Sequence, residues 1–540
     1  MQSPKEDVAF QLVQEPQDSF VPLRDAESGV SRRARGQSYR TINRHTSRQR
    51  LSKLESMIHE EHSKALIPTN VMYVTVLISL LGTFQEGWML SQLNYKYFDS
   101  NCQKDPIPDG DCIMFPGHSK HEWTMNVTSW IVGGMIGALF SGIPADKFGR
   151  KRTIFLGACV MITGAIIQVC SNTIYVFSFG RMISGISSGL AINVDNVLIT
   201  EIAPANLRGL FSTGLQVGIA LGSLSVTTAH YALNSETYSW RILVGFPIVL
   251  GALQILLNPL MTHSPVWLVS QGKIEEAGKE LRRLYKPCNY DAILEAIVES
   301  HEEEQRELTG INPWAALFSA KYRKQLIIAV VLCSAQQLTG VDAIMYYSSS
   351  IFSIAGLSDP RVGNTIINII RTTFILVAAK IMDKFNRKTL LCTGMTFMAI
   401  ASGGVMYSLS HTVSAGCVGS LALFMAAFCL SIGPMAWMVS TEIFPDFLHA
   451  NAGSTGEVFT WLGNFLVGVF YPVVSSDDKL GNNAFGIFVG LNMLFVAFVW
   501  FYVPETAHKT YVEIQKSFGI EEPPIETPSE DDPWNNEKKE

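Results

Sequence analysis

The sequence predicts an all-α membrane protein in which twelve transmembrane helices form two six-helix repeats, with a small helical domain between them. Three observations support this fold class: the composition, the number of apolar segments and a set of motifs that occurs twice. Only 16% of the 540 residues are charged and 48% are hydrophobic, whereas a soluble domain has about 25% charged residues. The deficit indicates that much of the chain faces lipid.

Twelve apolar segments are long enough to cross a bilayer, which takes about 20 residues each. They cover approximately residues 68–94, 124–144, 153–171, 175–200, 209–232, 241–261, 324–352, 363–382, 389–410, 416–440, 452–475 and 484–503. The segment 263–322 is instead rich in Glu, Lys and Arg at helical spacing. The predicted parts are a disordered basic tail (1–66), an N-terminal six-helix bundle (67–262), a helical linker domain (263–322), a C-terminal six-helix bundle (323–504) and an acidic tail (505–540).

Positive charge predicts the orientation. The short loops DKFGRKR (146–152) and DKFNRK (383–388) are basic, whereas short loops on the opposite side such as YALNSETYSW and SHTVSAG carry no Lys or Arg. Basic loops remain in the cytosol, so both termini and the linker domain are expected there. The loop 95–122 is then extracellular, where a disulfide between Cys102 and Cys112 is expected.

The two halves repeat each other. DKFGRK at position 146 returns as DKFNRK at 383, and ITEIAP, with Glu201, returns as STEIFP, with Glu442. Parallel repeats that place a site between them at mid-membrane are typical of transporters. Since the sequence has no nucleophile–base set, phosphate loop or metal cluster, we expect neither catalysis nor a cofactor. The expected partners are a small-molecule substrate and the lipid bilayer, without nucleic acid, and the protein is expected to work as a monomer.

An ordered set of motifs gives a more specific identification. The first half contains GRMISGISSG (180–189) and EIAPANLRG (201–209), and the second contains QQLTGVDAIMYYSSSIF (336–352), GPMAWMVSTEIFP (433–445) and VPETAHKTYVEI (503–514). Over roughly residues 70–515 the chain resembles the sugar porter family of the major facilitator superfamily, in particular its facilitative glucose transporters. The resemblance implies the major facilitator fold, a plasma-membrane location and sugar transport.

The resemblance also implies a set of substrate-binding residues. Amide side chains suit sugar hydroxyls, and an aromatic face suits the sugar ring. The matching positions are Gln216, Gln336, Gln337, Trp437 and Trp461, with Tyr346 and Tyr347 at the outer gate.

Four positions depart from the glucose-transporter pattern. They are Asp342 and Arg371, both in place of asparagine, Cys429 in place of glutamate, and Thr460 in place of asparagine. Asp342, Arg371 and Thr460 are predicted to bind substrate from these positions.

Arg371 is the most informative departure, because a charge at the bilayer centre costs roughly 2.5–3.5 kcal/mol on insertion scales. We favour a buried salt bridge between Asp342 and Arg371, since the two changes are complementary. In the alternative, Arg371 is the counter-ion of an anionic substrate. Glu86, a second acid within a span, is another candidate partner and a candidate proton carrier.

Charged residues at the cytosolic ends of the helices form the predicted cytosolic gate. These residues are Asp146, Arg150, Arg152, Glu201 and Arg208 in the first half, and Asp383, Arg387 and Glu442 in the second. Weak pairs between neighbouring helices suit a gate that opens and closes. His449 stands where the repeat predicts an arginine.

The function predicted from the sequence is transport of a hexose or a related small polyhydroxylated solute by alternating access, as a facilitative carrier. Two alternatives stay open: an organic-anion or sugar-acid carrier that uses Arg371, and a nutrient sensor that keeps the fold without transport.

Overall fold

A computed structural model describes residues 66–98, 102, 107, 112–233, 239–308, 312–476, 478–507, 509 and 511–519. Within these residues the protein is helical, and the sole β-type pairing is an isolated bridge between Pro68 and Tyr285. The arginine-rich segment 31–50 and most of the acidic tail lie outside the described residues, so their predicted disorder stays a prediction.

The first six predicted spans correspond to seven helices, because the second span is bent. They are α2 (Asn70–Ser91), α3 (Lys120–Phe140), α4 (Gly142–Phe148), α5 (Arg150–Cys170), α6 (Ile174–Ile202), α7 (Ala205–Ala229) and α8 (Ser239–Leu257). Helices α3 and α4 meet at 45°.

The last six predicted spans correspond to eight helices, because two of them are broken. They are α13 (Arg323–Leu338), α14 (Val341–Ile354), α15 (Pro360–Ile381), α16 (Arg387–Ser410), α17 (Ser414–Leu430), α18 (Ile432–Glu442), α19 (Asp446–Val474) and α20 (Phe485–Tyr502).

The described residues contain ten helical segments that are long and apolar enough to cross a membrane, and the bent pair α3–α4 makes an eleventh. Helix α2, with 22 residues, corresponds to the first predicted span and brings the number of spans to twelve. Its hydropathy is lower because it carries Gln85 and Glu86. The predicted all-α fold is confirmed.

The two broken spans have identifiable causes. Between α13 and α14 the chain turns at Gly340, whose φ of +107° and contact with the Phe488 ring leave no room for a side chain. Helix α17 ends at Leu430, four residues before Pro434. Proline has no N–H for the carbonyl of the residue four positions earlier, which explains the break. Both breaks free backbone polar groups inside the C-terminal half.

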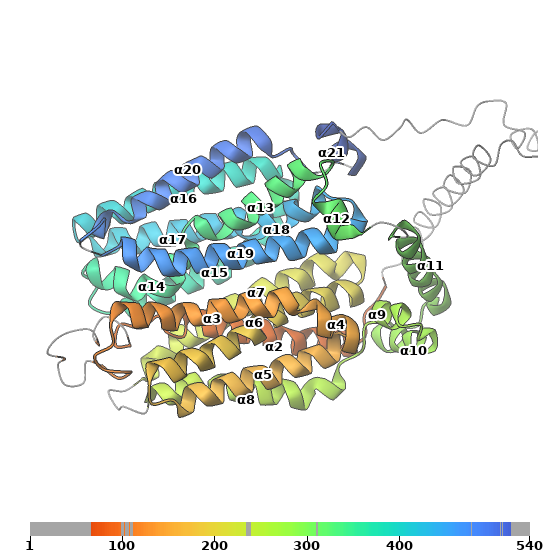
Figure 1. Ribbon diagram of the computed structural model, residues 1–540, viewed down its shortest axis with the longest axis horizontal. Coiled ribbons are helices and arrows are strands. Elements are labelled where there is room, and N and C mark those ends of the chain that lie inside the picture. Colours follow the sequence, from red (N-terminus) through yellow and green to blue (C-terminus); the bar gives the residue numbers. More distant parts are fainter. Residues whose placement is uncertain are drawn as a thin grey trace, which may run out of the picture. The chain divides into compact units, whose positions relative to one another are not determined.

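The two halves meet along two seams. Within the first half, α6 packs against α3 and α5, and α2 packs against α7; within the second, α16 packs against α17 and α20, and α13 against α18 and α19. Between the halves α7 lies beside α15, and α3 lies beside α19 (Figure 1). Residues on these four helices are therefore positioned to link or separate the halves.

The segment between the halves is helical, as predicted. It comprises α9 (Pro265–Ser270), α10 (Ile274–Leu284), α11 (Tyr290–Leu308) and α12 (Pro313–Leu317). These helices lie at the same end of the bundle as α21 (Tyr511–Ser517) (Figure 1). Trp267 of α9 packs in a small apolar cluster with Leu268, Val269 and Ala277, and its Nε1 donates to the Asp146 carbonyl at 2.8 Å.

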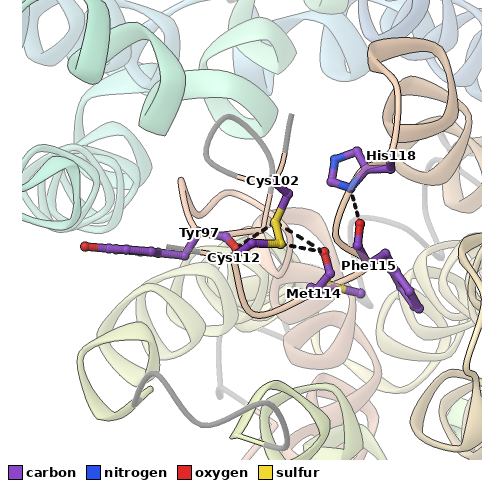
Figure 2. The surroundings of a disulfide bond; sticks show 6 residues. All are labelled: Tyr97, Cys102, Cys112, Met114, Phe115 and His118. Atoms are coloured by element: carbon purple, nitrogen blue, oxygen red, sulfur yellow. Dashed lines mark hydrogen bonds between the residues drawn. A yellow bond between two sulfur atoms is a disulfide. The ribbon is translucent and has the colours of Figure 1, made fainter. Parts of the chain in front are cut away.

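The predicted disulfide between Cys102 and Cys112 is present (Figure 2). It closes the loop between α2 and α3, at the end of the bundle opposite the linker helices. The loop continues through Phe115, whose carbonyl lies 2.8 Å from Nδ1 of His118. The His118 ring stacks on Trp123, and burial lowers the pKa of this histidine.

Replacing both disulfide cysteines, as Cys102→Ser with Cys112→Ser, is expected to lower the free energy of unfolding by about 2–3 kcal/mol, because the unfolded loop regains conformational freedom. The measurement is a thermal melt of the detergent-purified protein. Cys170→Ser, at an exposed free cysteine, is the matched control and should leave the melting temperature unchanged. Equal melting of the double variant and the wild type would contradict a stabilising disulfide.

Candidate substrate site

Three predicted substrate residues gather around α13. Trp437 of α18 donates its Nε1 to Oε1 of Gln336 at 3.2 Å, and Nε2 of Gln336 donates to the Gly433 carbonyl at the start of α18. Thr460 of α19 donates to the Cys333 carbonyl at 3.5 Å. The Gln336 amide therefore holds the broken end of α18 against α13.

Trp461 reaches out of the C-terminal half into the N-terminal half. Its ring lies on Gly134 of α3, where an added Cβ would approach the ring to 2.2 Å, and it meets Trp130 edge-on at 5.6 Å. Its Nε1 donates to Oε1 of Glu457, one turn earlier on α19, at 2.6 Å. Trp461 thus packs in the seam between α3 and α19.

The remaining predicted amides are not joined to this group by a hydrogen bond. Gln216 lies on α7 with an exposed side chain, and Gln337 is half-buried on α13, where it borders Gly463 of α19. Gln216 thus lies on a helix of the α7–α15 seam, and Gln337 lies beside α19 of the other seam. Their role in substrate binding stays a prediction.

The two tyrosines predicted at the outer gate are hydrogen-bonded to α19. Tyr346 donates to Oδ1 of Asn464 at 2.8 Å, and Tyr347 donates to the Gly468 carbonyl at 2.9 Å. Nearby, Nδ2 of Asn94, after the end of α2, donates to the Met345 carbonyl at 2.8 Å and to Ser348 at 2.7 Å. Helix α14 is thereby held by both halves.

The direct ion pair predicted between Asp342 and Arg371 is not formed in this structure. Among the described residues, Arg371 has no carboxylate within 4.0 Å; instead its Nη1 donates to Oγ of Ser223 on α7 at 3.4 Å and lies 4.0 Å from the sulfur of Met345. Asp342 lies in the first turn of α14, where the helix dipole stabilises a negative charge. The guanidinium therefore reaches across the seam.

Arg371 is the innermost member of a row of hydrogen bonds along the α7–α15 seam. One turn further along each helix, Nδ2 of Asn368 donates to Oγ1 of Thr227 at 3.3 Å. Beyond that pair, Nη1 of Arg361 donates to the His230 carbonyl at 3.4 Å. We call these three contacts the seam row. The members are four and three residues apart along α7 and the residue that follows it, and three and seven residues apart along α15. They therefore lie on one face of each helix and keep these faces together.

The seam row points towards the disulfide-bonded loop. Asn94 lies at the same end, and its backbone carbonyl accepts from Ser349 at 2.8 Å. Ser223 also donates to the Gly87 carbonyl of α2 at 2.9 Å. The halves are therefore linked from mid-membrane outwards on this side.

The charged groups predicted as a cytosolic gate form pairs within each half. Nη2 of Arg150 lies 2.8 Å from Glu201, and its Nη1 lies 3.3 Å from Asp146. In the second half, Nη2 of Arg387 lies 3.7 Å from Glu442. Each pair therefore joins segments of the same half.

The other residues of the predicted gate lie as follows. Arg152 and Arg208 are exposed, and the side chain of Asp383 lies outside the described residues. His449 contacts the Phe444 carbonyl at 2.9 Å through Nε2. Glu505, which the sequence analysis missed, accepts from the backbone N–H groups of Arg387 and Lys388 at 2.8 and 3.1 Å.

The structure adds two buried acids that the sequence analysis missed, Asp195 of α6 and Glu457 of α19. Both stand inside apolar segments, so a search for acids within the spans, like the one that found Glu86, finds them. Arg371 interacts electrostatically with the carboxyls of Glu86 and Asp342, and Glu86 interacts in turn with Glu457. Each of these carboxyls has one oxygen without a hydrogen-bond partner among the described residues. No group of three His, Cys, Asp or Glu residues suited to a metal gathers in the described part of the chain.

Comparison with known proteins places this site in a family context. Residues 73–518 match the family model described as "Sugar (and other) transporter". The human solute carrier family 2, facilitated glucose transporter member 3, is 29% identical, over 83% of this chain and 92% of its own. The arabinose-proton symporter of Bacillus subtilis is 31% identical, over 72% and 85%.

Solved structures show the same fold. The proton:xylose symporter XylE bound to 6-bromo-6-deoxy-D-glucose superposes with a TM-score of 0.67 at 23% identity, covering 83% of this chain and 98% of its own. The inward-open form of XylE from E. coli gives a TM-score of 0.69 at 22% identity, covering 83% and 99%.

The Arg150–Glu201 pair should be important for stability, because both side chains are largely buried, with 12% and 13% exposed. Arg150→Ala leaves the Glu201 carboxylate without its cation. The expected loss lies between that of a surface pair, below about 1 kcal/mol, and that of a buried pair, about 3–5 kcal/mol. A thermal melt of the purified protein measures it.

The exposed pair Arg306–Glu302 provides the control for this prediction, since its side chains are 73% and 58% exposed. Arg306→Ala should leave the melting temperature unchanged, and Arg150→Ala together with Glu201→Ala should recover part of the loss. Equal effects of Arg150→Ala and Arg306→Ala would show that the pair does not stabilise the fold.

Proposed function

This chain belongs to the sugar transporter family of the major facilitator superfamily, and from this premise we propose that it carries a neutral hexose, or a closely related polyhydroxylated solute, by alternating access. It is a membrane carrier and not an enzyme. The membrane is the plasma membrane, both termini and the linker helices face the cytosol, and one chain is the working unit.

The charge balance at mid-membrane supports a neutral substrate. Arg371 already interacts with the carboxyls of Glu86 and Asp342, and Glu457 adds a third carboxyl that interacts with Glu86. An anionic substrate would bring a further acidic group into a buried region in which carboxyl groups already outnumber guanidinium groups. This observation disfavours the sugar-acid carrier that Arg371 alone suggests.

Polar groups that recognise hydroxyls remain available on both sides of the seam. Gln216 on α7 and Gln337 on α13 each carry an amide that can donate to and accept from sugar hydroxyls. Trp437, half-buried on α18, offers an aromatic face next to Gln336. The site requires the two halves to approach each other around the solute.

The seam row is the external gate of this cycle. Because its contacts join α7 to α15, they are formed when the halves meet on the side of the disulfide loop. They must break before that side can open. Each contact is a single hydrogen bond, worth about 1 kcal/mol between neutral groups and about 1.5–3 kcal/mol where an arginine donates, so thermal motion can break the contacts one at a time. Arg371, at its inner end, touches both the gate and the mid-membrane region.

Uptake of labelled sugars into oocytes tests the substrate class. We expect the wild-type protein to take up glucose or fructose above water-injected cells, and glucuronate at background level, because the latter adds a negative charge beside the three carboxyls. Uptake of glucuronate without hexose would contradict the proposal. Surface expression with no uptake of any of the three would favour the sensor.

Cross-linking tests the seam row. With cysteines introduced as Thr227→Cys and Asn368→Cys, where the native side chains lie 3.3 Å apart, oxidation should stop hexose uptake and dithiothreitol should restore it. The physical reason is that a covalent bond prevents the halves from parting at the gate. Each single cysteine variant is the control for the seven native free cysteines. Full uptake by a quantitatively cross-linked protein would exclude this row as a gate.

A further inference from the structure

Asp195 is buried inside the N-terminal half, apart from the substrate region. Only 1% of the surface of Asp195 is exposed. The side chain borders an internal cavity of about 10 Å³ lined by four helices, with Gly82 and Gln85 from α2, Gly157 from α5 and Gln254 from α8. A cavity of this size is at the lower limit of the room that one water-sized ligand needs.

The polar atoms around this cavity are mainly acceptors. Neither carboxylate oxygen of Asp195 has a hydrogen-bond partner among the described residues, and neither does Oε1 of Gln85. The donors of the two amides are directed elsewhere. Nε2 of Gln85 bonds to the Leu81 carbonyl at 3.2 Å and to Oε1 of Gln254 at 3.1 Å, and Nε2 of Gln254 bonds to the Ile78 carbonyl at 3.2 Å.

An ionised carboxylate in this position is expensive. Without a partner it loses its hydration and gains nothing in return, which costs several kcal/mol even after relaxation. Neither buried arginine pairs with Asp195. Arg371 is bonded to Ser223 of α7, and Arg181 is bonded to Gln92 and to the backbone carbonyls of Asn126 and Met89. A small cation at the carboxylate removes the cost.

The charged groups around α6 leave Asp195 without compensation. On α2, Glu86 interacts electrostatically with Asp195 and, as a second acid, offers it no compensation. Glu201, further along α6, is already paired with Arg150 of α5. The remaining residues that line the cavity, from α2, α5, α6 and α8, are uncharged.

The packing leaves room for a ligand no larger than a single ion. A Cβ on Gly82 would lie 2.8 Å from Oδ2 of Asp195, so the missing side chain at this glycine makes space for the carboxylate. We propose that the Asp195 cavity binds one small monovalent cation, either H⁺ or Na⁺, with the Asp195 carboxylate as its anchor and Oε1 of Gln85 as a further ligand.

Thermal stability of the full chain in detergent tests the site without requiring any sugar. In the Na⁺ arm, NaCl replaces choline chloride at constant ionic strength and pH 8.5. In the H⁺ arm, the pH is lowered from 8.5 to 5.5 in choline chloride. A cation that binds only the folded state stabilises it. We expect one arm to raise the wild-type melting temperature by roughly 2–4 °C, and the arm that does so identifies the ion.

Asp195→Asn should abolish that response, because an amide needs no cation, and its melting temperature at pH 8.5 without Na⁺ should match or exceed that of the wild type. Asp291→Asn, at an exposed position of α11, is the matched control and keeps the wild-type response. Gly82→Ala, which crowds the carboxylate while retaining it, should weaken the response. This variant replaces Asp195→Asn as the test if Asp195→Asn does not fold. An identical response in the wild type, Asp195→Asn and Gly82→Ala, or none in the wild type, would overturn the proposal.

Discussion

The cost of placing charge inside an apolar bilayer governs this molecule. Four acids and two arginines lie buried among the described spanning helices: Glu86, Asp195, Asp342, Glu457, Arg181 and Arg371. Each must be stabilised by hydrogen bonds, by a helix terminus, by another charge or by a ligand. Arg181 is stabilised by hydrogen bonds, and Asp342 by the first turn of α14. The other four groups are Glu86, Asp195, Glu457 and Arg371. The way in which each is stabilised points to the proposed gate, substrate site or cation site.

Arg371 shows how one buried charge can hold two halves together. Its side chain is on α15, but its hydrogen bond is to Ser223 on α7, which in turn donates to the Gly87 carbonyl on α2. Its own backbone carbonyl accepts from Cys429 of α17 at 3.7 Å. Arg371 of α15 therefore contacts α7 and α17 directly and is linked to α2 through Ser223. If α7 separated from α15, the Arg371 guanidinium would lose Ser223 and could pair with the carboxyl of Glu86 or Asp342 instead.

The fold could be predicted largely from the sequence, because span length, basic loops and the repeated motifs are all local signals. The disulfide was predicted by the same kind of argument. The site could be predicted only in part. Trp437 and Gln336 do meet, but their contacts with the break in α18 depend on how α13 and α18 pack.

The Asp342–Arg371 pair was predicted from complementary charge, which gives no information about direction. In the structure the Arg371 side chain points into the α7–α15 seam, towards Ser223. No sequence pattern indicates that this serine is important. The seam row was missed for the same reason: Ser223, Thr227 and Asn368 are ordinary polar residues in helices. They become a set only when two antiparallel helices lie with matching faces together.

The arrangement of the acids explains how the substrate site and the gate can influence each other. Glu86 directly precedes Gly87, and Gly87 lies so close to α7 that an added Cβ would collide with the Ile219 backbone. A shift of α2 caused by a change of charge at Glu86 would therefore move α7 and its Ser223 contact with Arg371. Helix α2 also lines the Asp195 cavity through Gly82 and Gln85. One helix thus touches the cation site, the mid-membrane carboxyls and the inner end of the gate, so that the occupancy of one can alter the stability of the others.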